Sequence, residues 1–153
     1  MIAQYVSYAM AAVLVAAVVI ELRTGKIPNW LTLLPFVLFI ILAASGADRT
    51  FLAWQLGLAA IVFLIGIALF MFAGFGAGAA KLMTGVALFV PWDRGWYALI
   101  VFVVALFASA FVIVNLRKLA GSESSSWNVL AKNVMPMSVP LATMGFAVLF
   151  VAP

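Results

Sequence analysis

The sequence contains no cysteine and no histidine among its 153 residues. The absence of cysteine excludes disulfides, thiolate metal sites and cysteine nucleophiles. The absence of histidine excludes Ser-His catalysis and histidine-ligated metals. We therefore expect neither a metal nor any other cofactor.

Charged residues are scarce too: they make up 8% of the chain, against about 25% in a soluble domain, whereas hydrophobic residues make up 69%. With a mean hydropathy of +1.32, this composition predicts an integral membrane protein. Apolar runs recur along the whole length, so we expect one membrane domain over residues 1–153. The first run lacks the basic start and the cleavage site of a signal peptide, and we interpret it as a spanning helix.

The apolar runs predict the number of helices. A helix needs about 20 apolar residues to cross a membrane, and runs near this length cover 2–20, 30–46, 51–75, 96–114 and 134–152. A further run over 76–91 would reach only about 24 Å at about 1.5 Å per residue, less than the bilayer core of about 30 Å. We predict an all-α fold of six transmembrane helices, the fourth short and starting at a glycine-rich stretch.

The basic residues lie between the apolar runs and predict the orientation. Two of them, Arg49 and Arg94, fall on one side of the membrane, and six fall on the other: Arg23, Lys26, Lys81, Arg117, Lys118 and Lys132. The positive-inside rule makes the second side cytoplasmic, with both termini outside and a cytoplasmic loop over 115–133. The net charge of +4 therefore reflects topology, and we expect no nucleic-acid partner.

Only four acidic residues could supply carboxylate chemistry. Asp48 and Asp93 fall in short outer loops, and Glu123 falls in a serine-rich stretch typical of a solvated loop. Glu21 ends the first predicted helix on the cytoplasmic side. A charged flank next to the membrane is one interpretation of Glu21, but an acid is electrostatically disfavoured at a helix C-terminus, which favours a functional role.

Two short motifs carry a resemblance to a known family. The stretch ELRTGKIPN, residues 21–29, resembles the first motif of the type IV prepilin peptidases, an acid followed by a basic residue and Ile-Pro-Asn. The stretch GAGAAKL, residues 76–82, resembles their second motif, Gly-x-Gly-Asp-x-Lys-Leu. The matched catalytic positions are Glu21 and Ala79, and the motif-supporting positions are Lys26, Ile27, Pro28, Asn29, Gly76, Gly78 and Lys81.

The resemblance implies an intramembrane aspartic peptidase of the bacterial inner membrane. Such an enzyme removes the short basic leader of a prepilin at the cytoplasmic face, so the implied partners are a prepilin, with its basic leader and apolar helix, and the lipid bilayer. The small size resembles the form that serves tight-adherence (Flp) pili. Larger relatives carry a cysteine-containing segment and also methylate the new N-terminus; without that segment, we expect no methyltransferase activity here.

The resembling family has aspartate at both acidic positions, whereas this chain has Glu21 at the first and Ala79 at the second. Electrostatic repulsion disfavours the ionisation of both of two neighbouring carboxylates. One therefore keeps a proton while the other activates water. Glu21 retains a carboxylate with one extra methylene, whereas Ala79 has no proton to give or take. We predict that the chain as written cannot carry out two-carboxylate hydrolysis.

Three alternatives remain open at this point. The otherwise intact second motif favours an introduced Asp→Ala change, whereas Glu21 and the divergent MPMSVP stretch near the C-terminus (residues 135–140) favour a natural pseudo-peptidase that assists pilus assembly. Small residues such as Gly74 and Gly78 also commonly let membrane helices approach closely without any catalytic role. A transporter is disfavoured, because ionisable residues are almost absent from the apolar runs.

Overall fold

The computed structural model describes residues 2–73, 75–120 and 135–151, and helices are the only regular elements in these parts of the chain. The all-α prediction is therefore confirmed for the described residues. The longer helices are α1 (Ile2–Thr24), α2 (Asn29–Ala44), α3 (Arg49–Ala73), α4 (Ala77–Ala87), α5 (Gly95–Ala120) and α7 (Ser138–Phe146). Two short elements complete them, the 3₁₀ turn η1 (Trp92–Arg94) and the π-helical turn η2 (Ala147–Val151).

Three helices, α1, α3 and α5, are long and apolar enough to cross a membrane. Helix α2 and the combined α7 and η2 segment are shorter apolar helices. Helix α4 has 11 residues and so rises only about 16 Å at about 1.5 Å per residue. The short fourth helix agrees with the sequence prediction, while the number of spans stays a prediction.

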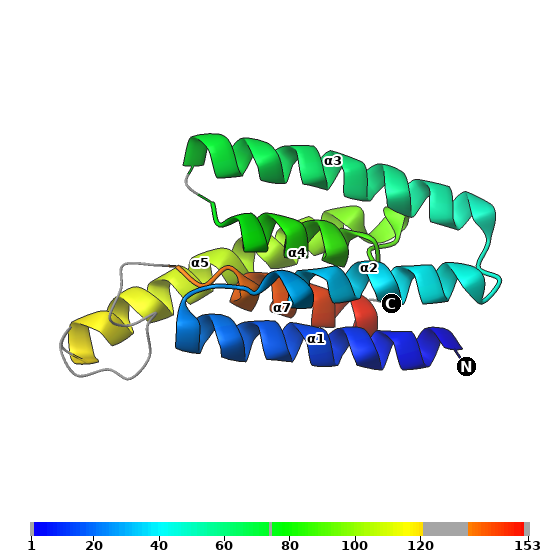
Figure 1. The fold of residues 1–153 in the computed structure, drawn as a ribbon. Coiled ribbons are helices and arrows are strands. Elements are labelled where there is room, and N and C mark those ends of the chain that lie inside the picture. Colours follow the sequence, from blue (N-terminus) through cyan, green and yellow to red (C-terminus); the bar gives the residue numbers. More distant parts are fainter. Residues whose placement is uncertain (1, 74, 121–134, 152–153) are drawn as a thin grey trace.

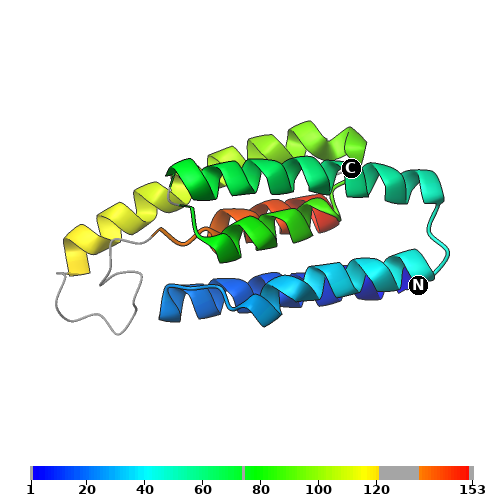
Figure 2. The same ribbon diagram turned by 45° about the horizontal axis from the view of Figure 1, so that its top comes forward.

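Helices α4 and α7 lie side by side in the middle of the bundle (Figures 1 and 2). Helix α4 also packs against α2 and α3, and α7 packs against α1 and α5. The side chains of Met10, Leu14, Leu82 and Leu141 are fully buried where these helices meet. The two short helices thus form the centre of the core. This central position explains why most residues of α4 are buried.

A glycine on α4 allows a close approach to α2. Gly85 faces Pro35, and a Cβ at position 85 would come within 2.7 Å of the Pro35 Cβ atom. The proline ring cannot rotate away from such a contact. Glycine at this position therefore sets the spacing between the two helices, as small residues commonly do in membrane bundles.

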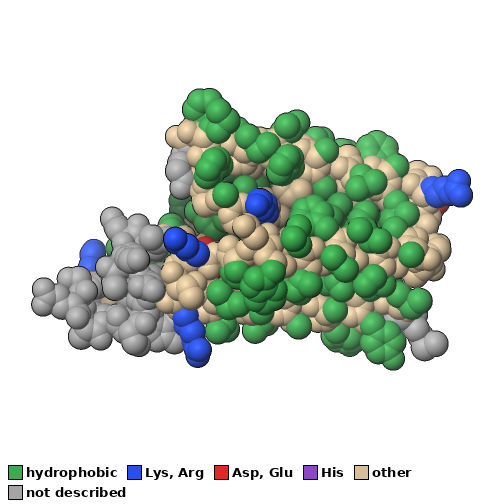
Figure 3. Space-filling view, in the orientation of Figure 1, with side chains coloured by type: hydrophobic (Ala, Val, Ile, Leu, Met, Phe, Trp, Pro, Cys, Tyr) green, Lys and Arg blue, Asp and Glu red, His purple; other side chains and the backbone are tan. Residues whose placement is uncertain are grey.

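Apolar side chains are spread over the face of the molecule shown in Figure 3. Among the exposed apolar side chains of the molecule are Leu64 and Phe72 on α3 and Phe107 and Phe111 on α5. Such an apolar exterior fits lipid rather than water. Of the predicted loop 115–133, residues 115–120 continue α5 as helix, and residues 121–133 lie outside the described part of the chain.

Candidate active site

Glu21 lies in the last turn of α1 and is only 5% exposed. The chain turns directly after this helix at Gly25, whose φ of 71° lies in the left-handed region that glycine adopts readily. The Gly25 amide donates to the Glu21 carbonyl at 2.7 Å and closes the helix end. This turn leads the backbone from α1 into the Ile-Pro-Asn stretch.

The Glu21 carboxylate binds the first residue of α7. The backbone N–H of Ser138 donates to Glu21 Oε2 at 2.6 Å, and the Ser138 hydroxyl donates to the same oxygen. Ser138 is fully buried. Amide groups at a helix start lack partners within the helix and favour an acidic neighbour, so the unfavourable end of α1 is offset by the favourable end of α7.

Sequence reasoning did not identify Ser138 as a partner of Glu21. The two residues are 117 positions apart, and no local spacing links them. One signal was available: a buried carboxylate requires donors, and the divergent MPMSVP stretch contains a serine. That serine is the donor.

The second motif lies at the start of α4. Gly76 is extended and precedes the helix, and Ala79 is its third residue and is buried. The methyl group of Ala79 belongs to the same buried cluster as Ile27 and Leu31. Position 79 therefore lies within the buried core of the bundle, directly after Gly78.

Two contacts join the second motif to the first. A Cβ at Gly78 would come within 2.8 Å of the Ile27 carbonyl oxygen, so only glycine fits there without a shift of the backbone. One helical turn further on, the Lys81 ammonium donates to the Asn29 side-chain oxygen at 3.1 Å. The two motifs thus form one structural unit, although about 50 residues separate them.

The remaining motif residues shape the turn between α1 and α2. The Lys26 side chain is exposed, and its backbone exchanges hydrogen bonds with the Thr24 hydroxyl. Pro28 precedes α2 in an extended conformation, and its carbonyl accepts from the amides of Leu31 and Thr32. These bonds hold Ile27 and Asn29 in position to meet α4.

The structure thus brings most of the predicted site residues to one end of the bundle, where α1 ends and α4 and α7 begin (Figure 1). The hydrogen bonds of the Glu21 carboxylate run to α7, while the contacts of α4 run to residues 27–29. Within the described residues, no group of three or more acidic, histidine or cysteine side chains could hold a metal ion.

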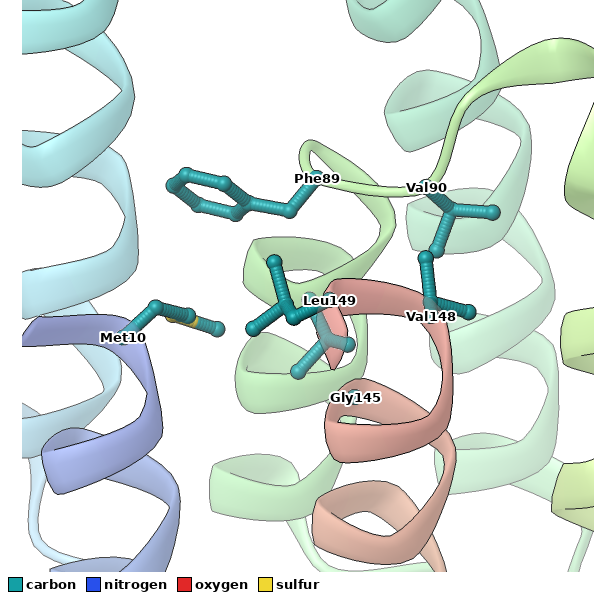
Figure 4. A pocket seen from close by; sticks show the side chains of 7 residues that line it. Met10, Phe89, Val90, Gly145, Val148 and Leu149 are labelled. Carbon is teal, nitrogen blue, oxygen red and sulfur yellow. The ribbon is translucent and has the colours of Figure 1, made fainter. Parts of the chain in front are cut away.

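An apolar pocket at the other ends of α4 and α7 does not contribute to this site. Figure 4 shows its lining, which includes Met10, Phe89 and Leu149. No charged side chain lines this pocket. It therefore offers no group for acid or base chemistry.

Comparison with protein families decides which family this is. The model of the type IV leader peptidase family matches residues 8–114, which are 107 of the 153 residues. The chain belongs to the type IV leader peptidase family. The matched region includes both motifs, residues 21–29 and 76–82, and ends before α7. Ser138 therefore lies outside the matched region. No curated protein and no solved structure matches the chain.

Family membership and the apolar helices together indicate a membrane protein with a peptidase-like function. The matched region contains Glu21 and position 79. The contacts of Gly78 with Ile27 and of Lys81 with Asn29 also lie within the matched region.

Proposed function

We propose that this chain is a prepilin leader peptidase of the Gly-x-Gly-Asp type, in a form that lacks its second carboxylate. The observation that carries the proposal is the packing of Gly78 on Ile27, reinforced by the bond from Lys81 to Asn29. These contacts link position 79 to the segment that follows Glu21. Family membership supports a leader peptide as the substrate.

The proposed reaction requires carboxylates at positions 21 and 79. One carboxylate would take a proton from water as the water oxygen attacks the scissile carbonyl carbon. The other, protonated, would give its proton to the amine that leaves when the carbon–nitrogen bond breaks. With Ala79 in place, Glu21 has no acidic partner in the second motif, and we expect the chain to bind a leader without cleaving it.

The proposed setting is the bacterial inner membrane, with the site at the cytoplasmic face and both termini outside. The cations Arg23, Lys26 and Lys81 support this orientation, because all three lie near the end of the bundle where α1 ends and α4 begins. The absence of cysteine from these 153 residues supports the Flp pilus branch.

A natural pseudo-peptidase that assists pilus assembly is the second candidate. The bonds between Glu21 and Ser138 favour it, because they give the remaining acid a structural partner on α7. In this alternative the chain would hold prepilins, or the assembly machinery, without turnover.

Restoring the missing acid tests the proposal. The Ala79→Asp variant, in lipid nanodiscs with a synthetic prepilin peptide, is expected to release the leader, and mass spectrometry would identify the cleaved bond. Ala79→Asn is the matched control, because it adds a polar group of the same size without an acid. Binding without cleavage by Ala79→Asp would favour the pseudo-peptidase, and the absence of binding would contradict both candidates.

A further inference from the structure

A shallow apolar groove of about 290 Å³ runs between α1 and α7. Its walls are short aliphatic side chains and one aromatic ring, so the groove is lined by carbon atoms over nearly its whole length. The lining residues are Val15, Val18 and Val19 from α1, and Val139, Ala142, Thr143 and Phe146 from α7.

Along both helix axes the groove begins next to the level of Glu21 and Ser138, although neither residue lines it. On α1 its residues precede Glu21 by two to six positions, and on α7 they follow Ser138 by one to eight positions. At about 1.5 Å per residue, the groove starts beside the bonded pair and extends about 9 to 12 Å from it. Because α1 ends and α7 begins at the same end of the bundle (Figure 1), both walls run from the acid toward the middle of the apolar span.

This arrangement restricts what the groove can accept. In lipid, a peptide must satisfy its own backbone hydrogen bonds and therefore enters as a helix. A span of about 12 Å corresponds to about eight helical residues, or two turns. Val15 and Val19 are 49% and 40% exposed, so the groove opens to the bilayer at its side and a helix can enter laterally.

We infer that the groove between α1 and α7 binds the first two helical turns of the apolar prepilin stem, immediately after the scissile bond. This inference rests on the proposed function and adds to it the surface that positions the substrate. An apolar stem in the groove places the polar cleavage segment at the Glu21 end, where the groove stops. A lipid acyl chain could fill the same volume, but it would bring no peptide bond to the carboxylate.

Site-directed photo-crosslinking tests the inference on the full chain, which is expected not to cleave and so should keep its complex intact. A photoreactive phenylalanine analogue would replace Thr143 or, separately, Val19. The matched control is the same replacement of Leu64, a 66% exposed residue on α3. The probe is a synthetic prepilin peptide with a basic leader and an apolar stem, in nanodiscs of stated phospholipid composition.

The inference predicts peptide adducts from positions 143 and 19 that map within the first eight stem residues, and far fewer from position 64. If the peptide binds but forms adducts equally at position 64, or if positions 143 and 19 label lipid alone, the groove is not the docking surface and the proposed function survives. If no peptide binds in an equilibrium fluorescence titration, the proposed function and the groove both fail.

Filling the groove provides a second test. Thr143→Trp adds a large ring at an exposed groove position, and Leu64→Trp adds the same ring on α3. Thr143→Trp is expected to weaken peptide binding by on the order of tenfold, equivalent to about 1.4 kcal/mol, while Leu64→Trp leaves the affinity unchanged. In the Ala79→Asp background, the effect should fall on KM more than on kcat. Equal affinities for the two tryptophan variants would overturn the inference.

Discussion

Replacement of Gly78 by alanine probes the contact between the two motifs. The added Cβ would stand 2.8 Å from the Ile27 carbonyl oxygen and 3.1 Å from the Ile27 Cβ atom. Overpacking of this kind costs about 1–3 kcal/mol, while alanine gains about 0.8–1.0 kcal/mol over glycine in a helix. The nearest atom belongs to the backbone and cannot rotate away, which favours the upper part of the overpacking range, and we expect a net loss of up to about 2 kcal/mol in the free energy of unfolding.

Gly57 provides the matched control for this substitution. It lies inside α3, and a Cβ there would meet nothing within 4 Å. Gly57→Ala should therefore leave stability unchanged or raise it by up to about 1 kcal/mol. The assay is reversible unfolding in mixed micelles by titration with dodecyl sulfate, followed by tryptophan fluorescence.

Activity provides a second readout for the same pair of variants. In the Ala79→Asp background, a backbone shift at Gly78 moves position 79 relative to Glu21. A misplacement of about 1 Å can cost on the order of 100-fold in rate, so Gly78→Ala should lose most of the restored cleavage and Gly57→Ala should keep it. Wild-type stability and full cleavage in Gly78→Ala would refute the close packing of the two motifs.

Three further substitutions test other contacts of the site and core. Ser138→Ala removes one donor from the buried Glu21 carboxylate and should cost about 1–3 kcal/mol in the same unfolding titration. Ser138→Thr should retain most of the stability. An alanine variant as stable as the unchanged chain would contradict the hydrogen bond from the Ser138 hydroxyl. Lys81→Met removes an exposed hydrogen bond and should cost under about 1 kcal/mol, so a larger loss than in Gly78→Ala would show that Lys81 does more than we infer. Gly85→Ala places a Cβ 2.7 Å from the Pro35 Cβ atom. It should lower the midpoint of the unfolding titration by an amount equivalent to about 1–3 kcal/mol. An unchanged midpoint would show that α2 and α4 can separate freely.

The fold could be predicted from the sequence to a large extent, because hydropathy reports directly on membrane helices. The short α4 followed from the length of its apolar run, and its start next to Gly76 followed from the glycine-rich motif. The extension of α5 to Ala120 was not predicted, because the polar residues after position 114 indicated the start of a loop. Hydropathy measures burial in lipid, and a helix that continues into water gives no such signal.

The candidate site was only partly predictable. Motif spacing identified Glu21 and position 79, and the grouping of both motifs at one end of the bundle followed from the expected topology. The pairing of Glu21 with Ser138 and the packing of Gly78 on Ile27 depend on helix contacts between distant parts of the chain. Sequence periodicity describes each helix separately, so it does not report which residue of one helix meets which residue of another.

The central claim is that positions 21 and 79 together form one catalytic site. The most direct measurement is the initial rate of prepilin leader cleavage by Ala79→Asp, compared with Ala79→Asp combined with Glu21→Gln. Glutamine keeps the size of the side chain and an oxygen that can accept from Ser138, but it has no carboxylate. The account predicts cleavage by the single variant and a loss of about 10²–10⁴-fold in the double variant. Equal rates for the two variants, or no cleavage by Ala79→Asp despite peptide binding, would contradict it.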